Sequence, residues 1–81
     1  MASVERIELQ KKIGQKIKSL RVSKGLTQVD LVGKINGNID TTNISRIESG
    51  RTNATIYNLY RIAVALEVSL ADLVTIESEQ N

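Results

Sequence analysis

Two short, capped helices joined by a polar turn, between residues 26 and 51, constrain this chain most. Thr27 and Asp30 have the spacing of a capping box, which starts the first of these helices. The glycine-containing turn at residues 36–38 breaks the helical pattern, and Asp40 can then cap a second helix. Gly50 can end that second helix in a left-handed turn. Two helices joined in this way, with hydroxyls and an arginine on the second, are typical of a DNA-reading unit.

Apolar residues recur at helical spacing along the rest of the chain and predict an all-α fold of five helices. The first three are expected at residues 4–24, 28–35 and 41–49. The expected core face of the first consists of Leu9, Ile13, Ile17 and Leu20. The apolar side of the second consists of Val29, Leu31, Val32 and Ile35.

The fourth helix is expected at residues 56–66, and Thr55 is its cap. Its core-facing stripe is predicted to be Ile56, Leu59, Ile62, Ala63 and Leu66, with Tyr57 and Tyr60 as partly buried packing residues. Ser69 and Asp72 form another capping box before a short fifth helix. That helix has more apolar residues than so small a domain can cover. The excess predicts a dimer interface formed by Leu66, Val68, Leu70, Val74 and Ile76.

The composition excludes several classes of function. The 81 residues contain no cysteine and no histidine, so disulfides, the usual zinc sites and the usual catalytic bases and thiol nucleophiles are absent. We therefore expect no enzyme, no metal, no cofactor and no small-molecule ligand. No apolar run approaches the length of a membrane span and no signal-peptide pattern is present, so a cytoplasmic protein is expected.

Charge is distributed unevenly along the chain. Residues 11–51 hold nine bases against three acids, a net +6, whereas residues 52–81 have a net charge of −3. A basic region that contains the two capped helices is the footprint of a phosphate-binding face. A solubilising surface is the alternative reading of the charge alone.

The third helix has one polar side without a carboxylate. A projection at about 100° per residue turns Ile44, Ile47 and Glu48 inward. The outer side and its free N-terminal end supply the predicted base-reading residues Thr41, Thr42, Asn43 and Arg46. Residues suited to phosphate contacts are Gln28, Lys34, Ser45, Ser49, Arg51, Thr52 and Asn53. Alternatively, Gln28 and Arg46 are solvated surface residues, and the threonines are merely tolerated at a helix start.

The motifs together resemble the Cro/repressor-type helix-turn-helix family, also known by the xenobiotic-response-element name. They are the residues Ile13-Gly14, Leu20-Arg21, the run from Lys24 to Gln28, Asp30-Leu31, the run from Ile44 to Gly50, and Ala63, Leu66, Val68 and Ser69. The resemblance covers about residues 9–74. It implies a five-helix domain that binds palindromic operators as a homodimer, with the third helix in the major groove. We assign residues 9–76 to this domain, with the apolar C-terminal helix as its dimerisation helix. Residues 1–8 are then an extension of the first helix, and residues 77–81 a polar tail.

The resemblance also implies residue roles. It places Gln28 at a phosphate or outer-base contact, and Thr41, Thr42, Asn43 and Arg46 at recognition positions. It implies a structural ion pair between Arg21 and Glu48, which links the first helix to the third.

Four positions depart from the family pattern. Val32 replaces the usual alanine, Ala54 stands where proline is frequent, and Glu67 stands where glycine usually ends the fourth helix. The turn at residues 36–38 makes the segment from Leu31 to Glu48 about two residues longer than is common in the family. This length leaves open the tilt of the third helix, and which of Thr41 and Thr42 reaches a base.

The function expected from the sequence is a dimeric, nucleoid-associated transcriptional regulator that binds double-stranded DNA. Stand-alone members of the family include phage repressors, controller proteins of restriction–modification systems and antitoxins. The alternative is an antitoxin-type protein-interaction module that also binds DNA, with its apolar C-terminal helix as the docking surface.

Overall fold

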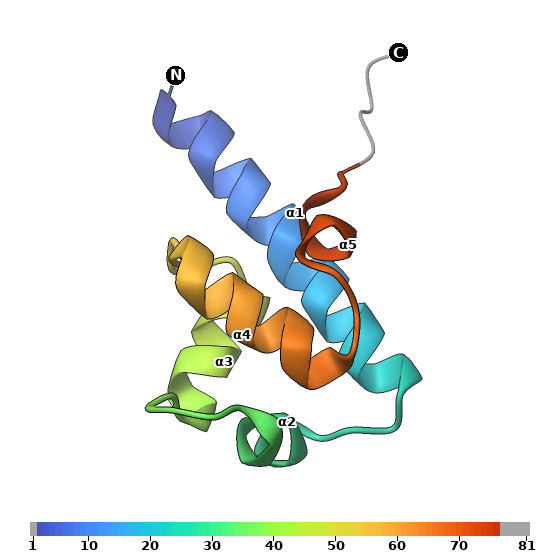
Figure 1. Ribbon diagram of the computed structural model, residues 1–81. Coiled ribbons are helices and arrows are strands. Elements are labelled where there is room, and N and C mark those ends of the chain that lie inside the picture. Colours follow the sequence, from blue (N-terminus) through green and yellow to red (C-terminus); the bar gives the residue numbers. More distant parts are fainter. Residues whose placement is uncertain (1, 77–81) are drawn as a thin grey trace.

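The computed structural model describes residues 2–76, with side chains from residue 5 onward. Within this range the chain forms five α-helices and no strand, which confirms the predicted all-α fold (Figure 1). They are α1 (Ala2–Ser23), α2 (Gln28–Lys34), α3 (Thr41–Glu48), α4 (Ile56–Leu66) and α5 (Leu70–Val74). The predicted polar tail at residues 77–81 lies outside the described residues.

Local capping interactions fix where the helices begin and end. At the start of α2, the Asp30 backbone N–H donates to the Thr27 hydroxyl at 3.0 Å, and the Thr27 N–H donates to the Asp30 carboxylate at 2.9 Å. Ser69 and Asp72 form the same reciprocal pair before α5. Gly25 ends the turn after α1 at a φ of 74°, which glycine adopts without strain.

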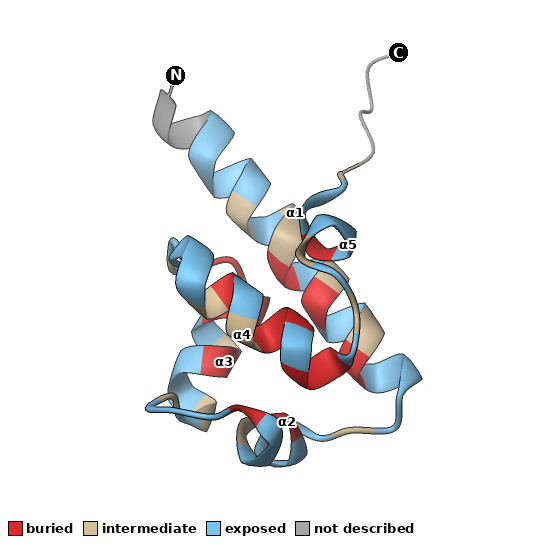
Figure 2. Cartoon of the chain, in the orientation of Figure 1, coloured by how far each residue is buried: buried red, intermediate tan, exposed pale blue. Residues whose placement is uncertain are grey.

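The core is built from all five helices. Fully buried side chains come from α1 (Ile17), α2 (Leu31), α3 (Ile44), α4 (Ile62 and Leu66) and α5 (Leu73). Figure 2 shows these buried segments facing one another between α1, α3 and α4, with exposed residues outside.

Three apolar residues predicted to face the core, and two tyrosines predicted to be partly buried, are instead exposed. Leu9 is 49% exposed because the N-terminal part of α1 extends beyond the other helices (Figure 1). Val29 and Ile56 are 68% and 75% exposed because they lie in the first turns of α2 and α4, where the helix faces solvent. Tyr57 and Tyr60 are 65% and 52% exposed rather than packed. Periodicity identifies a stripe, but a short helix buries only the part of that stripe that meets a neighbour.

A glycine allows α1 to lie against the C-terminal end of α3. A Cβ atom added to Gly14 would lie 2.6 Å from the Glu48 carbonyl oxygen and 2.8 Å from its carbon. Gly50 has a φ of 77°, and a Cβ there would lie 2.7 Å from the Cα of Lys11. The Gln10 side chain also donates to the Gly50 carbonyl at 3.0 Å. These contacts set the position of α3 against the scaffold.

Residues 2–76 contain neither a membrane-spanning helix nor a metal-binding cluster. No helix in this part of the chain has the length and apolar character required to cross a membrane. The same residues contain no cluster of carboxylates that could hold a metal ion.

Candidate nucleic-acid interface

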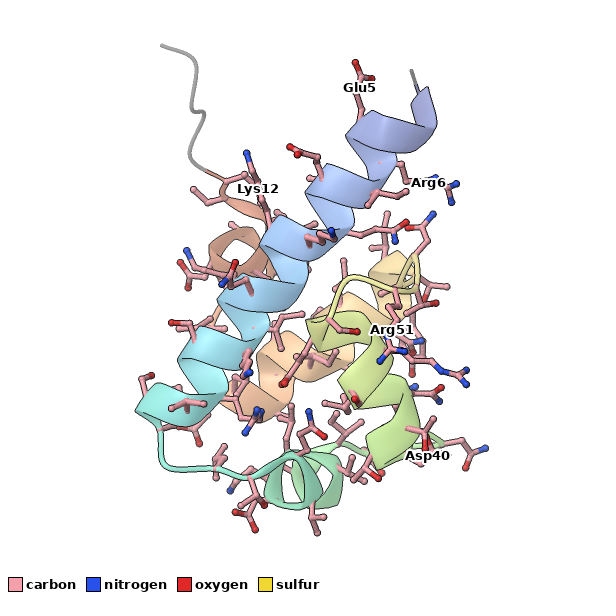
Figure 3. The ribbon with its side chains drawn as sticks, turned by 180° about the vertical axis from the view of Figure 1, so that it is seen from behind. Glu5, Arg6, Lys12, Asp40 and Arg51 are labelled. Atoms are coloured by element: carbon pink, nitrogen blue, oxygen red, sulfur yellow. The ribbon has the colours of Figure 1, made fainter. Side chains whose placement is uncertain are left out.

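The outer face of α3 is polar and open, while its inner face is buried. Ile44, Ile47 and Glu48 are 0%, 5% and 7% exposed, as the helical projection predicted. Thr42 and Arg46 are exposed on the opposite side. The Asp40 carboxylate caps this helix by accepting from the Asn43 backbone N–H at 2.9 Å. Figure 3 labels Asp40 at the N-terminal end of α3 and Arg51 just beyond its C-terminal end.

A shallow hollow crosses this outer face and gathers residues from three segments. Its lining consists of Gln28, Thr41, Thr42, Ser45, Arg46 and Arg51. The lining therefore contains two guanidinium groups, three hydroxyls and one amide, and no carboxylate. Such a surface is electropositive and rich in hydrogen-bond donors, which suits an anionic ligand. The structure thus brings six of the predicted contact residues together.

A buried ion pair supports the hollow from below. The Arg21 Nε donates to Glu48 Oε2 at 2.6 Å, and its Nη2 donates to Glu48 Oε1 at 2.9 Å. The remaining Nη1 donates to the Leu26 carbonyl at 2.8 Å. The hydrogen bond to Glu48 raises the pKa of the Arg21 guanidinium above its usual value, although burial opposes that shift. Both groups are 7% exposed, so this fork joins α1 to α3 rather than contacting a ligand.

Gln28 is tied to the same pair. Its Nε2 donates to Glu48 Oε1 at 3.0 Å, so one carboxylate holds both an arginine from α1 and an amide from α2. Gln28 still lines the hollow, but its orientation is set by the scaffold. The sequence identified Gln28 as a surface contact and gave no sign of this second role, because the partner lies 20 residues away.

The other predicted contact residues lie outside the hollow. Asn43 lies in a neighbouring depression with Gly37, Asn38 and Asp40. Lys34 lines a different depression, with Lys24 and Glu67. Thr52 and Asn53 lie against the N-terminal part of α1, beside Arg6 and Gln10. The Ser49 hydroxyl donates to the Arg46 carbonyl at 3.2 Å and accepts from Arg51 Nε at 3.3 Å.

The predicted dimer interface is wrong at one residue, Leu66. Leu66 is fully buried in the core, so it cannot contact a second subunit. Its helical position places it opposite the exposed side of α4, where the chain packs on α5. Val68 and Leu70 are partly buried against the same core, and Val74 is 42% exposed. Ile76 lies in a depression with Lys12, Lys16 and Thr75.

The sequence reading missed an exposed apolar stripe on α4. Ile56, Tyr60 and Val64 are 75%, 52% and 56% exposed, and Tyr57 lies beside them. Their spacing of four residues puts the first three on one face, which was a visible signal. That spacing is ambiguous, however, because Ile56 also fits the periodicity of the buried face.

Known proteins resemble this chain over most of its length. A family model described as helix-turn-helix matches residues 17–73. An uncharacterized HTH-type transcriptional regulator, y4dJ, of Sinorhizobium fredii is 36% identical over 69 residues, which are 85% of this chain and 87% of that protein.

Solved structures share the fold. The restriction–modification controller protein C.AhdI from Aeromonas hydrophila is 30% identical with a TM-score of 0.73, and the match covers 79% of this chain and 94% of that one. An HTH_3-family transcriptional regulator from Vibrio cholerae is 26% identical with a TM-score of 0.77 over 84% of this chain. The present chain spans 37% of that larger protein.

The match to the family model covers well over half of the chain. The matched residues include all of α2, α3 and α4 and the buried Arg21–Glu48 pair. The family consists of DNA-binding regulators and is not a class of enzymes. The chain therefore belongs to the helix-turn-helix family of DNA-binding transcriptional regulators.

Proposed function

We propose that this protein binds a palindromic DNA operator as a homodimer, with α3 of each subunit in the major groove. The observation that carries the proposal is the acid-free hollow on the outer face of α3. The hollow presents donors from α2, α3 and the following loop on one side of the molecule. A groove with phosphates on both walls and base edges between them fits such a surface.

Base reading is assigned to the outer face of α3. Arg46 is exposed at the middle of that face and can fork onto the O6 and N7 of a guanine. Thr41 and Thr42 line the same hollow and can bond a base or contact a thymine methyl. Asn43, nearer the turn, has the two groups that pair with adenine.

Phosphate contacts are assigned to polar residues inside the hollow and outside it. Ser45, Arg51 and Gln28 are in the hollow itself, and the Ser49 hydroxyl is held by Arg51. Lys34, which lines a depression with Lys24 and Glu67, is kept as a proposed phosphate contact, as are Thr52 and Asn53 beside the N-terminal part of α1. The net charge of +6 over residues 11–51 would draw the protein to DNA before the specific contacts form. A protein that binds a DNA operator is located at the nucleoid, and this is the location we propose.

Two surfaces compete as the dimer interface. The first is the C-terminal surface, formed by Val68, Leu70, Val74 and Ile76, of which Val74 is the most exposed of the large apolar residues. The second is the α4 stripe, formed by Ile56, Tyr57, Tyr60 and Val64. We retain the C-terminal surface as the proposal, and sedimentation of Val74→Glu and Tyr60→Glu decides between them. A monomeric Val74→Glu supports it, whereas a monomeric Tyr60→Glu moves the interface to α4.

The regulatory role is that of a phage-type repressor or a restriction–modification controller protein. Similarity to a controller protein along 94% of that protein's length supports this class. Regulation then depends on the concentration of the protein, through dimerisation and operator filling. An antitoxin-type interaction module is the second candidate, and the exposed α4 stripe favours it because such a face can seat a partner protein.

The proposal is tested by selecting bound sites from random DNA and then measuring Arg46→Ala on the selected site. We expect this variant to lose about 1–3 kcal/mol of binding and to relax the preference at one base pair. Arg51→Ala is the matched control, because removal of a phosphate contact weakens binding to all sequences and reduces the salt slope by about one. Failure to select any sequence would refute the proposal, and unchanged affinity in Arg46→Ala would remove that residue from the readout.

A further inference from the structure

The turn between α2 and α3 is anchored at its ends but open at its apex. Ile35 is 7% exposed and Ile39 packs against the core, so both ends of residues 35–40 are fixed. The apex residues Asn36, Gly37 and Asn38 are exposed. Asp40, the cap of α3, follows two residues later. The conformation of this apex therefore affects where α3 begins.

An arginine from α4 reaches this apex. The Arg61 Nη1 donates to the Asn36 carbonyl at 3.3 Å, and its Nη2 donates to the Asn38 carbonyl at 3.5 Å. Each contact is long for a hydrogen bond and weak alone. A planar guanidinium group holds both at once, however, because its donors are fixed relative to one another. The result is one rigid group that contacts both sides of the apex.

The guanidinium group is itself held in place. Its Nη2 donates to the Asn58 side-chain oxygen at 2.8 Å, and its central carbon lies 4.9 Å from the centroid of the Tyr57 ring. Both partners are on α4, and the distance to the Tyr57 ring is within the range of a cation–π contact. The Nε of Arg61 is buried and has no hydrogen-bond partner among the described residues. Burial of that donor costs free energy, so the other contacts must hold the side chain there.

Gly37 makes room for this arrangement. Its φ of 130° is a conformation that side-chain-bearing residues rarely adopt. A Cβ at this position would clash with the Arg61 Nη1 atom. The glycine and the arginine therefore fit together, in the turn that is longer than the family pattern.

We infer that Arg61 is a positioning residue for DNA readout. It holds the apex of the α2–α3 turn and thereby sets the N-terminal end of α3, which carries Thr41, Thr42 and Asn43. Asn43 lines one depression with Gly37 and Asn38, so the apex and the reading face adjoin directly. The inference rests on the proposed function for its DNA part, whereas the clamp on the turn is a property of the free protein.

The first experiment measures amide hydrogen exchange in the free protein. In Arg61→Ala and Arg61→Lys, we expect the amides of residues 37–43 to exchange at least about tenfold faster, with those in α1 unchanged. Lysine keeps the charge but cannot hold two carbonyls in a fixed fork, so it should not rescue. Lys18→Ala, which removes one exposed charge from α1, is the control and should change nothing. Unchanged exchange in both Arg61 variants would overturn the clamp.

The second experiment measures binding to the operator selected by the wild-type protein and to a scrambled duplex. We expect Arg61→Ala to lose affinity for the operator by about tenfold, with the scrambled duplex and the salt slope unchanged. A uniform loss with a salt slope lower by about one, restored by Arg61→Lys, would show that Arg61 contacts phosphate and would overturn the inference.

A third variant separates positioning from folding. Asn58→Ala removes the 2.8 Å contact that orients Arg61 and leaves the arginine in place. We expect the same changes in exchange and affinity, but smaller, at an unchanged thermal midpoint. Wild-type affinity and exchange in this variant would contradict the inference even if Arg61→Ala failed to fold. If the wild-type protein selected no operator, the proposed function would fail, while the exchange result would still decide whether Arg61 holds the turn.

Discussion

The two ends of α3 are held by contacts of different kinds. At the C-terminal end, Gly14 brings the α1 backbone against α3, and the buried Arg21–Glu48 pair joins the same two helices. At the N-terminal end, the contacts are exposed: the Asp40 cap and the Arg61 guanidinium on the turn. Buried, close-packed contacts fix a position strongly, whereas solvent-exposed contacts are individually weak.

The contrast between the two ends indicates which part of α3 can be repositioned. The C-terminal end of α3 is a fixed anchor, because any shift there would separate a buried ion pair or create a backbone clash. The N-terminal end can be adjusted by the length of the turn and by single polar side chains. Thr41, Thr42 and Asn43, the residues assigned to bases, lie at that adjustable end.

Loss of the buried carboxylate should have the largest effect. Glu48→Ala leaves Arg21 charged, buried and unpaired, and we expect a loss of about 3–5 kcal/mol in the free energy of unfolding. Chemical denaturation measures it. The double variant Arg21→Met with Glu48→Leu is the control and should lose much less, because no charge is then left buried. A loss below 1 kcal/mol for the single variant, well under that range, would mean that the anchor is not at this pair.

A methyl group at Gly14 should be nearly as harmful. Gly14→Ala forces the α1 backbone away from the Glu48 carbonyl, and we expect a loss of about 3 kcal/mol in unfolding free energy. Gly33→Ala in α2 is a matched control, because a Cβ there meets nothing within 4 Å. That control should gain about 0.5–1 kcal/mol from helix propensity. Equal effects of the two alanines would contradict the close approach of α1 to α3.

At the opposite end of α3, removal of the cap should cost less. Asp40→Ala deprives the Asn43 backbone N–H of its acceptor, and we expect a loss of about 1 kcal/mol in unfolding free energy. Asp40→Asn keeps an acceptor and should remain close to the wild type in the same denaturation experiment. A loss as large as that of Glu48→Ala would abolish the contrast between the two ends.

The smallest expected effect is a pH dependence at the neighbouring helix α2. Hydrogen bonds from the Thr27 backbone N–H and hydroxyl lower the pKa of Asp30. A lowered pKa in the folded state means that the contribution to stability is present above the unfolded pKa of about 3.9 and is lost as the pH falls through the folded pKa. Wild type should therefore exceed Asp30→Asn in thermal midpoint at pH 7 and match it in strong acid. In a Thr27→Ala background the difference at pH 7 should be smaller but still present, because the backbone N–H of residue 27 continues to donate to the Asp30 carboxylate.

The sequence alone determined the local features of the fold. The helix starts at Thr27, Asp40, Thr55 and Ser69 were predicted and are present, because a capping bond joins residues only three positions apart. The inward side of α3 was predicted for the same reason, since helical geometry follows from the chain itself. Most of the residues that line the hollow on α3 could be predicted from this helical geometry.

Tertiary structure decided which apolar residues are covered and which polar side chains meet. Leu66 lies in the core and Ile56 in solvent, although both fit one periodic stripe. The bond from Gln28 to Glu48 and those from Arg61 to the turn join residues 20 to 25 positions apart. The sequence spacing of apolar and capping residues predicts the local geometry of a single helix. The distances between helices arise only when their side chains pack together, and those distances position the outer face of α3.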